Sequence, residues 1–306
     1  MSGRAGRLLR KVRALLSLSE ESRHANDELR LMIGTLLAHV NAERKRYASL
    51  AELEFKVFSQ FGDDGIIQYL TRHLPMRHRT FVEFGVEDYM ESNTRFLLQK
   101  DNWTGFVMDG SAECMARLRQ APFFWKHDLG AEAAFITREN VARLIADHTR
   151  SWSGLDLLHI DLDGNDYWIW QALEVAPSIV IVEYNSAFGA ERAVTIPYAA
   201  DFRRAEAHYS HLYWGASLKA LCVLARSKGY SLVGCNSAGN NAYFVRREML
   251  NDAVAEVSLE RGYVKSKYRE SRGPRGELTY LGVRERAEIL RGLPLFDVEQ
   301  HKQVVF

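Results

Sequence analysis

The 306-residue sequence lacks several features that would place it in a specialised class of protein. Its three cysteines, Cys114, Cys222 and Cys235, lie far apart and without metal-ligand spacing, so we expect free thiols in a reducing, cytoplasmic compartment. No apolar run reaches the roughly 18 to 20 residues that span a bilayer, and LLRKVRALLSL is too charged for a signal-peptide core. The formal net charge of +1 gives no overall basic excess, which argues against a nucleic-acid partner.

A glycine-rich turn that cradles phosphate is also absent, which disfavours an enzyme that uses a dinucleotide to process a nucleotide sugar. What is present is an ordinary globular composition, with 47% hydrophobic residues, that can fill a sizeable core. We expect three parts: a helical extension over residues 1–50, a ligand-binding domain over 51–250, and an extension over 251–306 that docks on the domain.

The first part has a helical pattern. From Leu8 to about Val40, apolar residues recur at three- and four-residue steps without proline, which predicts one or two amphipathic helices. One interpretation is that their apolar face packs on the domain or pairs with another copy to form a homodimer. Another is that residues 4–18, rich in arginine, lie on an anionic membrane at its inner face. Docking on a glycosyltransferase partner is a further alternative.

From about Phe55 onward, short apolar strands alternate with helices. Five such units predict a parallel, doubly wound α/β sheet, and the turn NSAGN (236–240) is too short for a parallel crossover, so the last two strands form an antiparallel hairpin. This is the arrangement of the class I, Rossmann-like fold of S-adenosylmethionine-dependent methyltransferases, with a seven-stranded sheet. The strands are predicted at 80–84, 105–109, 123–127, 156–160, 179–184, 230–235 and 241–246, and the helices at 93–99, 112–120, 138–149, 167–173 and 216–228.

In an open α/β sheet the ligand lies outside the carboxyl ends of the strands. The first strand leads into FGVEDYMESNT (84–94), where Gly85 permits close approach to a ligand, Glu83 suits an ammonium group, and Ser92 or Asn93 caps the next helix. We predict Asn93 at the cofactor. The loop has several carboxylates and no lysine, which repels a pyrophosphate and suits a cationic cofactor such as a sulfonium. The alternative is an acidic capped turn.

The second strand ends at Asp109, 26 positions after Glu83, where a carboxylate that accepts from ribose hydroxyls belongs. An Asp-Gly turn explains the same residue without a ligand. After the predicted third strand, Asp128 is placed to accept from an adenine amino group, and His127 is a second choice of general base. A capping aspartate before a loop is the alternative for Asp128.

The stretch LLHIDLDGNDYW (157–168) ends a buried strand in carboxylates. Asp161 and Asp163 suit a general base toward a substrate hydroxyl, while Asp161 with Glu183 and Asn185 of the next strand resembles a Mg²⁺ site. The alternative for Asp163 and Asp166 is helix capping. His159 is interpreted as a core histidine, because strand alternation points it into packing.

Several stretches carry a resemblance to a known family. LHIDLDGNDYWIWQAL followed by IVIVEYN resembles the FkbM-type methyltransferases, with Asp161, Asp163, Gly164, Asp166 and Glu183 on the family's motif positions. SQFGDDGII (59–67), FVEFGVEDYMESNT (81–94), YWGASLKAL (213–221) and GYSLVGCNSAGNNAYFVR (229–246) are similar to a bacterial subgroup, so the resemblance covers about residues 55–248. It implies transfer of a methyl group from S-adenosylmethionine to a hydroxyl oxygen, usually of a sugar or another secondary metabolite.

The acceptor is expected to bind at the segment between Glu183 and Ala216, which is far longer than the usual two to six residues of such a connection. Its aromatic residues Tyr198, Tyr213 and Trp214 suit a sugar, and the alternative is that these rings fill core. The sequence thus predicts an O-methyltransferase for a glycan, surface polysaccharide or secondary metabolite. The alternative from another class is a non-catalytic, Rossmann-like scaffold of a glycan-biosynthesis assembly.

Overall fold

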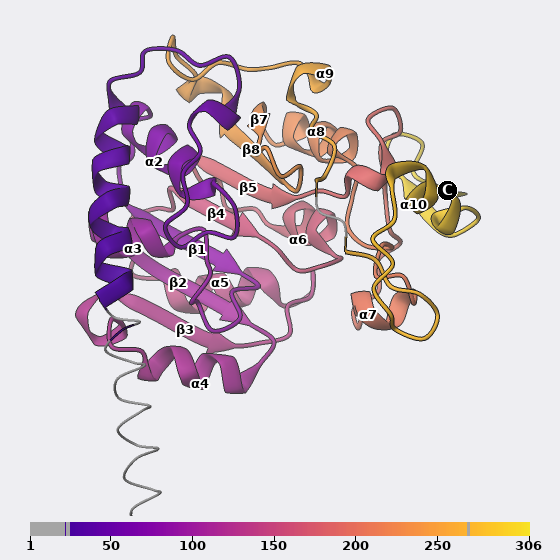
Figure 1. Cartoon of the computed structure of the whole chain (residues 1–306), viewed down its shortest axis with the longest axis horizontal. Coiled ribbons are helices and arrows are strands. Elements are labelled where there is room, and N and C mark those ends of the chain that lie inside the picture. Colours follow the sequence, from indigo (N-terminus) through magenta and orange to yellow (C-terminus); the bar gives the residue numbers. More distant parts are fainter. Residues whose placement is uncertain (1–21, 23–24, 268–269) are drawn as a thin grey trace, which may run out of the picture.

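A computed structural model describes residues 22, 25–267 and 270–306, and its centre is a seven-stranded sheet (Figure 1). The strand order is β3-β2-β1-β4-β5-β8-β7, with β1 to β5 parallel and β8 antiparallel to both of its neighbours. This confirms the predicted class I, Rossmann-like methyltransferase fold and its terminal hairpin. The strands are β1 Thr80–Phe84, β2 Thr104–Asp109, β3 Leu129–Ala133, β4 Leu157–Ile160, β5 Ile179–Glu183, β7 Tyr230–Cys235 and β8 Asn241–Arg246.

Helices cover both faces of this sheet. Strands β1, β4, β5 and β7 are buried along their whole length, which is why they read as continuous apolar runs rather than as alternating ones. One apolar cluster joins the sheet to α5 (Val141–Thr149), α6 (Asp166–Ala172) and α8 (Leu218–Ser227). A second cluster joins the opposite face to α2 (Asp63–His73), α3 (Arg95–Asp101) and α4 (Ala112–Gln120). The domain is therefore a three-layered α/β/α sandwich.

The prediction of the third strand is wrong. Residues 124–126 form a short 3-10 helix, and β3 begins at Leu129, opposite Gly105 of β2. Phe123 and Phe124 are partly buried against the core under α4, so their apolar character marks packing and not a strand. His127 and Asp128 consequently precede β3, at the edge of the sheet that lies opposite the carboxyl ends.

Other elements carried no sequence prediction. Helix α2 follows the loop over 55–62, and the segment after β5 contains β6 (Val194–Thr195) and α7 (Arg204–Ala207). The C-terminal part adds α9 (Leu259–Gly262), α10 (Val283–Leu290), β9 (Pro294–Asp297) and β10 (Lys302–Val305). Strand β9 pairs with both β10 and β6, so the C-terminal strands and the long connection after β5 build one small antiparallel sheet.

Of the predicted N-terminal helices, the structure describes one, over residues 25–42. It runs along the edge of the sandwich beside α2 and α3, in indigo in Figure 1. The basic stretch 4–18 lies outside the described residues. Across the described ranges, no helix is both long and apolar enough to cross a membrane. All three cysteines are free, as predicted.

Candidate active site

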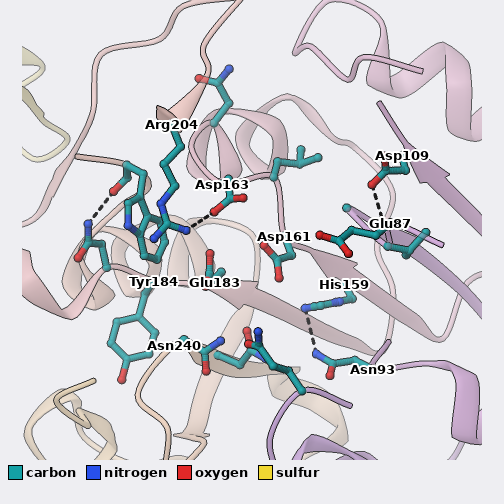
Figure 2. A pocket seen from close by; sticks show the side chains of 18 of the residues that line it. Glu87, Asn93, Asp109, His159, Asp161, Asp163, Glu183, Tyr184, Arg204 and Asn240 are labelled. Atoms are coloured by element: carbon teal, nitrogen blue, oxygen red, sulfur yellow. Dashed lines mark hydrogen bonds and ion pairs between the residues drawn. The ribbon is translucent and has the colours of Figure 1, made fainter. Parts of the chain in front are cut away.

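A cavity of about 840 Å³ opens at the carboxyl ends of the central strands (Figure 2). This is within the size range of small-molecule sites and at the edge where a doubly wound sheet binds its ligand. Nine of the predicted site residues line it: Glu83, Gly85, Asn93, Asp109, Asp161, Asp163, Glu183, Asn185 and Trp214.

Glu83 organises the loop after β1 and has no oxygen left for a ligand ammonium group. Its Oε1 accepts from the backbone N–H of Asn93 (2.9 Å) and from His159 Nδ1 (2.9 Å). Its Oε2 accepts from Ser92 Oγ (2.6 Å) and from both the backbone N–H and the hydroxyl of Thr94. Burial opposes the charge, but the hydrogen bonds from His159, Ser92 and Thr94 outweigh it and hold the pKa of Glu83 below its ordinary value. The predicted contact with an ammonium group is therefore corrected to a structural role.

His159 is a buried histidine with both ring nitrogens engaged, as the sequence indicates. Nδ1 faces Glu83, and Nε2 lies 3.1 Å from Asn93 Nδ2. The amide of Asn93 therefore accounts for the second ring nitrogen, and the loop after β1 is tied to β4 through this pair.

Gly85 is required by the packing of two backbone segments. Its φ is +72°, and a Cβ at this position would lie 1.7 Å from the carbonyl oxygen of Asp161. The glycine thus lets the loop after β1 pass directly against the end of β4. Close approach to a ligand, as predicted, is not what demands a glycine here.

Asp109 ends β2 at the same cavity. Its Oδ2 accepts from the backbone N–H of Glu87 (2.8 Å) and its Oδ1 from that of Ser111 (2.8 Å). A carboxylate offers about four lone-pair sites, so each oxygen keeps capacity for a ligand hydroxyl. Figure 2 shows Asp109 and Glu87 at one end of the cavity, away from Glu183.

His127 and Asp128 do not belong to the site. Asp128 Oδ2 accepts from Thr104 Oγ1 (2.9 Å) at the start of β2, and neither residue lines the cavity. Their predicted roles, adenine acceptor for Asp128 and alternative base for His127, are corrected because β3 begins later than the sequence indicates.

Asp161 and Glu183 form an acidic pair at the centre of the cavity, which Figure 2 shows with the two carboxyl groups close together. Burial, and after it the negative charge of Asp163, raise the pKa of Asp161 to about 7. Glu183 is 9% exposed, and its buried Oε2 has no hydrogen-bond partner among the described residues. Burial and the charge of Asp161 raise the pKa of Glu183 well above its ordinary range. Burial and mutual repulsion therefore favour the protonated form of this pair, most of all for Glu183.

Asp163 is exposed and is engaged by an arginine that sequence reasoning missed. Its backbone has a left-handed φ of +51°, and its Oδ1 accepts from Arg204 Nη1 (2.5 Å). Arg204 also donates from Nε to the carbonyl of His211 (2.8 Å), and its guanidinium lies 4.9 Å from the ring centroid of Trp214. This pairing occupies Oδ1 of Asp163 with a cation. Because Arg204 follows Asp163 by 41 positions, no local pattern could have connected them.

Asp166 closes the loop in front of α6. Its Oδ1 accepts from the backbone N–H of Leu162 (2.9 Å) and its Oδ2 from that of Gly164 (3.0 Å). The residue that caps α6 is Asn165, whose side chain makes no capping hydrogen bond. Asp163 therefore does not cap α6. Asp166 is the first residue of α6, where its carboxylate favours the helix dipole as the alternative had it, and it also fixes the backbone that presents Asp161.

The predicted magnesium site does not fit the donor groups. Asn185 Oδ1 accepts from the backbone N–H of Ala187 (3.0 Å), and its Nδ2 donates to the carbonyls of Leu212 (2.8 Å) and Trp214 (3.0 Å). The amide is thus used to hold the segment after β5. Throughout residues 25–267 and 270–306, no group of three histidine, cysteine, aspartate or glutamate side chains is placed to hold a metal ion. We derive no step through Mg²⁺.

Of the three predicted acceptor residues, Trp214 reaches the cavity. The Tyr198 hydroxyl donates to Glu139, and its ring lies 4.1 Å from the Arg138 guanidinium. The Tyr213 hydroxyl donates to the carbonyl of Pro294, and its ring joins the core of the small sheet. For these two tyrosines the packing alternative holds. The walls also include residues far along the chain that the sequence did not single out: Gln60, Phe61, Asn240, Ser266, Glu270 and Arg286.

No protein-family model matches the chain, and no curated protein matches it either. Solved structures are similar at low identity. The N-terminal domain of EvdMO1 with SAH bound is 11% identical, covering 61% of this chain and 80% of that one, with a TM-score of 0.40. An O-methyltransferase from Bacillus cereus in complex with SAH is 12% identical, covering 72% and 89%, with a TM-score of 0.41. A S-adenosylmethionine-dependent methyltransferase from Clostridium acetobutylicum is 11% identical, covering 60% and 89%, with a TM-score of 0.39.

Proposed function

We propose that the protein is a S-adenosylmethionine-dependent O-methyltransferase of the FkbM type that acts on a sugar hydroxyl of a glycan, a surface polysaccharide or a secondary metabolite. The observation that carries this proposal is the Asp161–Glu183 pair, which faces the same cavity as Asp109 at the carboxyl edge of a sheet with the methyltransferase strand order.

The residues present fit this cofactor. Glu87, Asp109, Asp161 and Glu183 line the cavity, and carboxylates favour a sulfonium cation. Asp109 would accept from the ribose hydroxyls with its remaining lone pairs. When bound, S-adenosylmethionine supplies a methyl group that is already activated for transfer.

Asp161 is the proposed general base. Its pKa of about 7 matches the operating range of a base at neutral pH, because the group is then substantially ionised and still basic. Asp161 would accept the proton that the acceptor hydroxyl loses on methylation. Burial and the charge of Asp161 favour the protonated form of Glu183, which would donate a hydrogen bond that orients the acceptor.

The lining of the cavity favours a neutral, polyhydroxylated acceptor. Both arginines in the lining are engaged, Arg204 by Asp163 and the carbonyl of His211, Arg286 by the carbonyl of Leu281. Carboxylates outnumber them, so a phosphate group on the acceptor would be repelled. Trp214 offers an aromatic face of the kind that packs on a sugar ring.

Calorimetric titration with S-adenosylhomocysteine tests the cofactor. We expect micromolar binding by the wild type, a loss of at least about tenfold in Asp109→Ala because a charged hydrogen-bond acceptor is removed, and no loss in Asp128→Ala. The second variant removes the same side chain at the opposite edge of the sheet. An absence of binding by the wild type would overturn the proposal in favour of a non-catalytic scaffold.

Methyl transfer to a panel of neutral oligosaccharides tests the acid pair. Asp161→Asn should keep its affinity for S-adenosylhomocysteine and lose about 10²- to 10⁴-fold in turnover, the usual contribution of a general base. Glu183→Gln should keep most of the turnover, because glutamine imitates a protonated glutamate. If Glu183→Gln loses as much as Asp161→Asn, the assignment of the proton to Glu183 is wrong.

A further inference from the structure

The helix over residues 25–42 has an apolar face that nothing in the described structure covers. Six large apolar side chains on it are exposed, from 40% for Leu37 to 68% for Leu36. Successive members are separated by three or by one position in the sequence, which places all six along one side of the helix. The six are Leu29, Met32, Ile33, Leu36, Leu37 and Val40, and we call them the outer stripe.

The opposite side of this helix is fastened to the domain, so the outer stripe cannot turn inward. Asp27 pairs with the buried guanidinium of Arg95 (2.6 Å), and Asn41 Nδ2 donates to the carbonyl of Leu53 (2.7 Å). Between them, Gly34 packs so closely that a Cβ would lie 2.3 Å from Val57 Cγ2. Ala38 is buried in the same apolar cluster. The outer stripe therefore faces away from the domain and is available to another molecule.

The spacing in the sequence indicates that the other molecule presents a helix. Leu8, Leu15, Leu29 and Leu36 are separated by 7, 14 and 7 residues, so all four occupy the same position of a seven-residue repeat. Such a repeat keeps one seam facing a partner helix as two helices supercoil. Within the 24 residues that precede the helix, Leu8 and Leu15 thus follow the spacing of the outer stripe, while Ser22 occupies the intervening position of the repeat.

A second copy of this chain is the occupant that satisfies the pattern. We propose that the outer stripe pairs with the outer stripe of a second copy, parallel and in register, around a two-fold axis. In that arrangement Leu29 and Leu36 meet their own counterparts, as at the core positions of a parallel coiled coil.

The basic residues near the N-terminus do not argue against a parallel pairing of two copies. A parallel pair brings Arg4, Arg7, Arg10, Lys11 and Arg13 of both copies to the same end. Repulsion between exposed like charges is screened by salt, whereas burial of leucine side chains is the main driving force for association. Flanking the outer stripe, Glu28 and Arg30 balance each other, so the described helix lacks the basic polar face of a membrane-surface helix.

Light scattering on the full-length chain during size-exclusion chromatography tests the dimer. We expect the wild type at twice the chain mass of 35.0 kDa and Leu29→Glu/Leu36→Glu at the chain mass itself. Leu278→Glu/Val283→Glu is the matched control, because it places the same charges on exposed apolar residues elsewhere and should remain a dimer. Melting temperatures within a few degrees of the wild type exclude unfolding as the cause. A wild type that stays at 35.0 kDa up to about 100 μM would overturn the proposal.

Oxidative crosslinking tests the orientation. Leu36→Cys should form a disulfide-linked dimer, because equivalent residues face each other across the axis of a parallel pair. The wild type, with its three cysteines, is the control. A dimer that fails to crosslink through residue 36 would overturn the parallel register. The remaining alternative is that the outer stripe contacts a membrane surface, and vesicles of phosphatidylglycerol test it. A monomeric wild type that binds these vesicles would assign the outer stripe to a membrane surface.

Discussion

The position of Asp161 depends on a residue with no side chain. Gly85 lies against the backbone carbonyl of Asp161, and Asp166 fixes the loop that follows by accepting from Leu162 and Gly164. The base is therefore placed by two backbone constraints, one from β1 and one from its own loop. Its raised pKa follows from the same burial.

We predict that Gly85→Ala destabilises the protein by about 3 kcal/mol or more and abolishes cofactor binding, because the new Cβ displaces the end of β4. Gly229→Ala is the matched control, since Gly229, just after the end of α8, also has a positive φ, +84°, with no atom within 4 Å of the added Cβ. It should cost only about 1 kcal/mol of left-handed strain. Urea unfolding of both variants measures the difference, and equal losses would contradict the clash with Asp161.

At the scale of elements, a buried arginine is one of the contacts that hold the helix over residues 25–42. Arg95 is 2% exposed on its side chain, pairs with Asp27, and lies over the rings of Phe58 (4.0 Å) and Phe123 (4.4 Å). The loop that carries Phe58 also hydrogen-bonds to Ser92 beside the cavity. The helix, the loop and the cavity wall therefore form one connected unit.

Replacing this arginine should release the helix. Arg95→Gln is expected to lose about 2–4 kcal/mol, because it removes one partner of a buried ion pair together with two cation–π contacts. Hydrogen exchange of residues 25–42 should speed up more than that of β4. Lys56→Gln breaks the exposed pair with Glu91 and should change stability by less than about 1 kcal/mol. Unchanged exchange in the helix would show that Arg95 does not anchor it.

At the scale of the whole molecule, the fold buries several carboxyl groups in an environment that favours their protonated form. Burial raises the pKa of Asp161 to about 7 and that of Asp166 to about 6, and it raises that of Glu183 well above its ordinary range. In the unfolded chain these groups ionise near pH 4. Between about pH 4 and 7 the native state thus binds protons that the unfolded state has lost, so the free energy of unfolding falls as the pH rises through this window.

Thermal unfolding across pH checks this statement. The melting temperature of the wild type should fall from pH 5 to pH 7.5. That of Asp161→Asn should fall less, because its neutral amide does not have to ionise in the folded state. The melting temperature of the variant, measured relative to that of the wild type, should therefore increase as the pH rises. Parallel curves for the two proteins would mean that Asp161 titrates in the native state near its ordinary pKa.

The alternation of short apolar runs with helices, and the short turn over 236–240, suffice to predict the sheet and its hairpin, because each is a local property of the chain. The same order places Asp109, Asp161 and Glu183 at one edge, where the structure has them. The edge strand β3 escaped prediction because LGAEA (129–133) has little apolar character, while the aromatic run before it serves the core.

What only the tertiary structure decided is which polar groups are already satisfied. Five donors of the protein occupy Glu83, backbone groups up to 29 residues away occupy Asn185, and Arg204 reaches Asp163 from the long connection after β5. The sequence determines which side chains reach the edge of the sheet, since strand order and strand ends follow from local periodicity. It does not determine which of them remain open to a ligand, because a hydrogen bond is settled by the approach of distant segments in the folded chain.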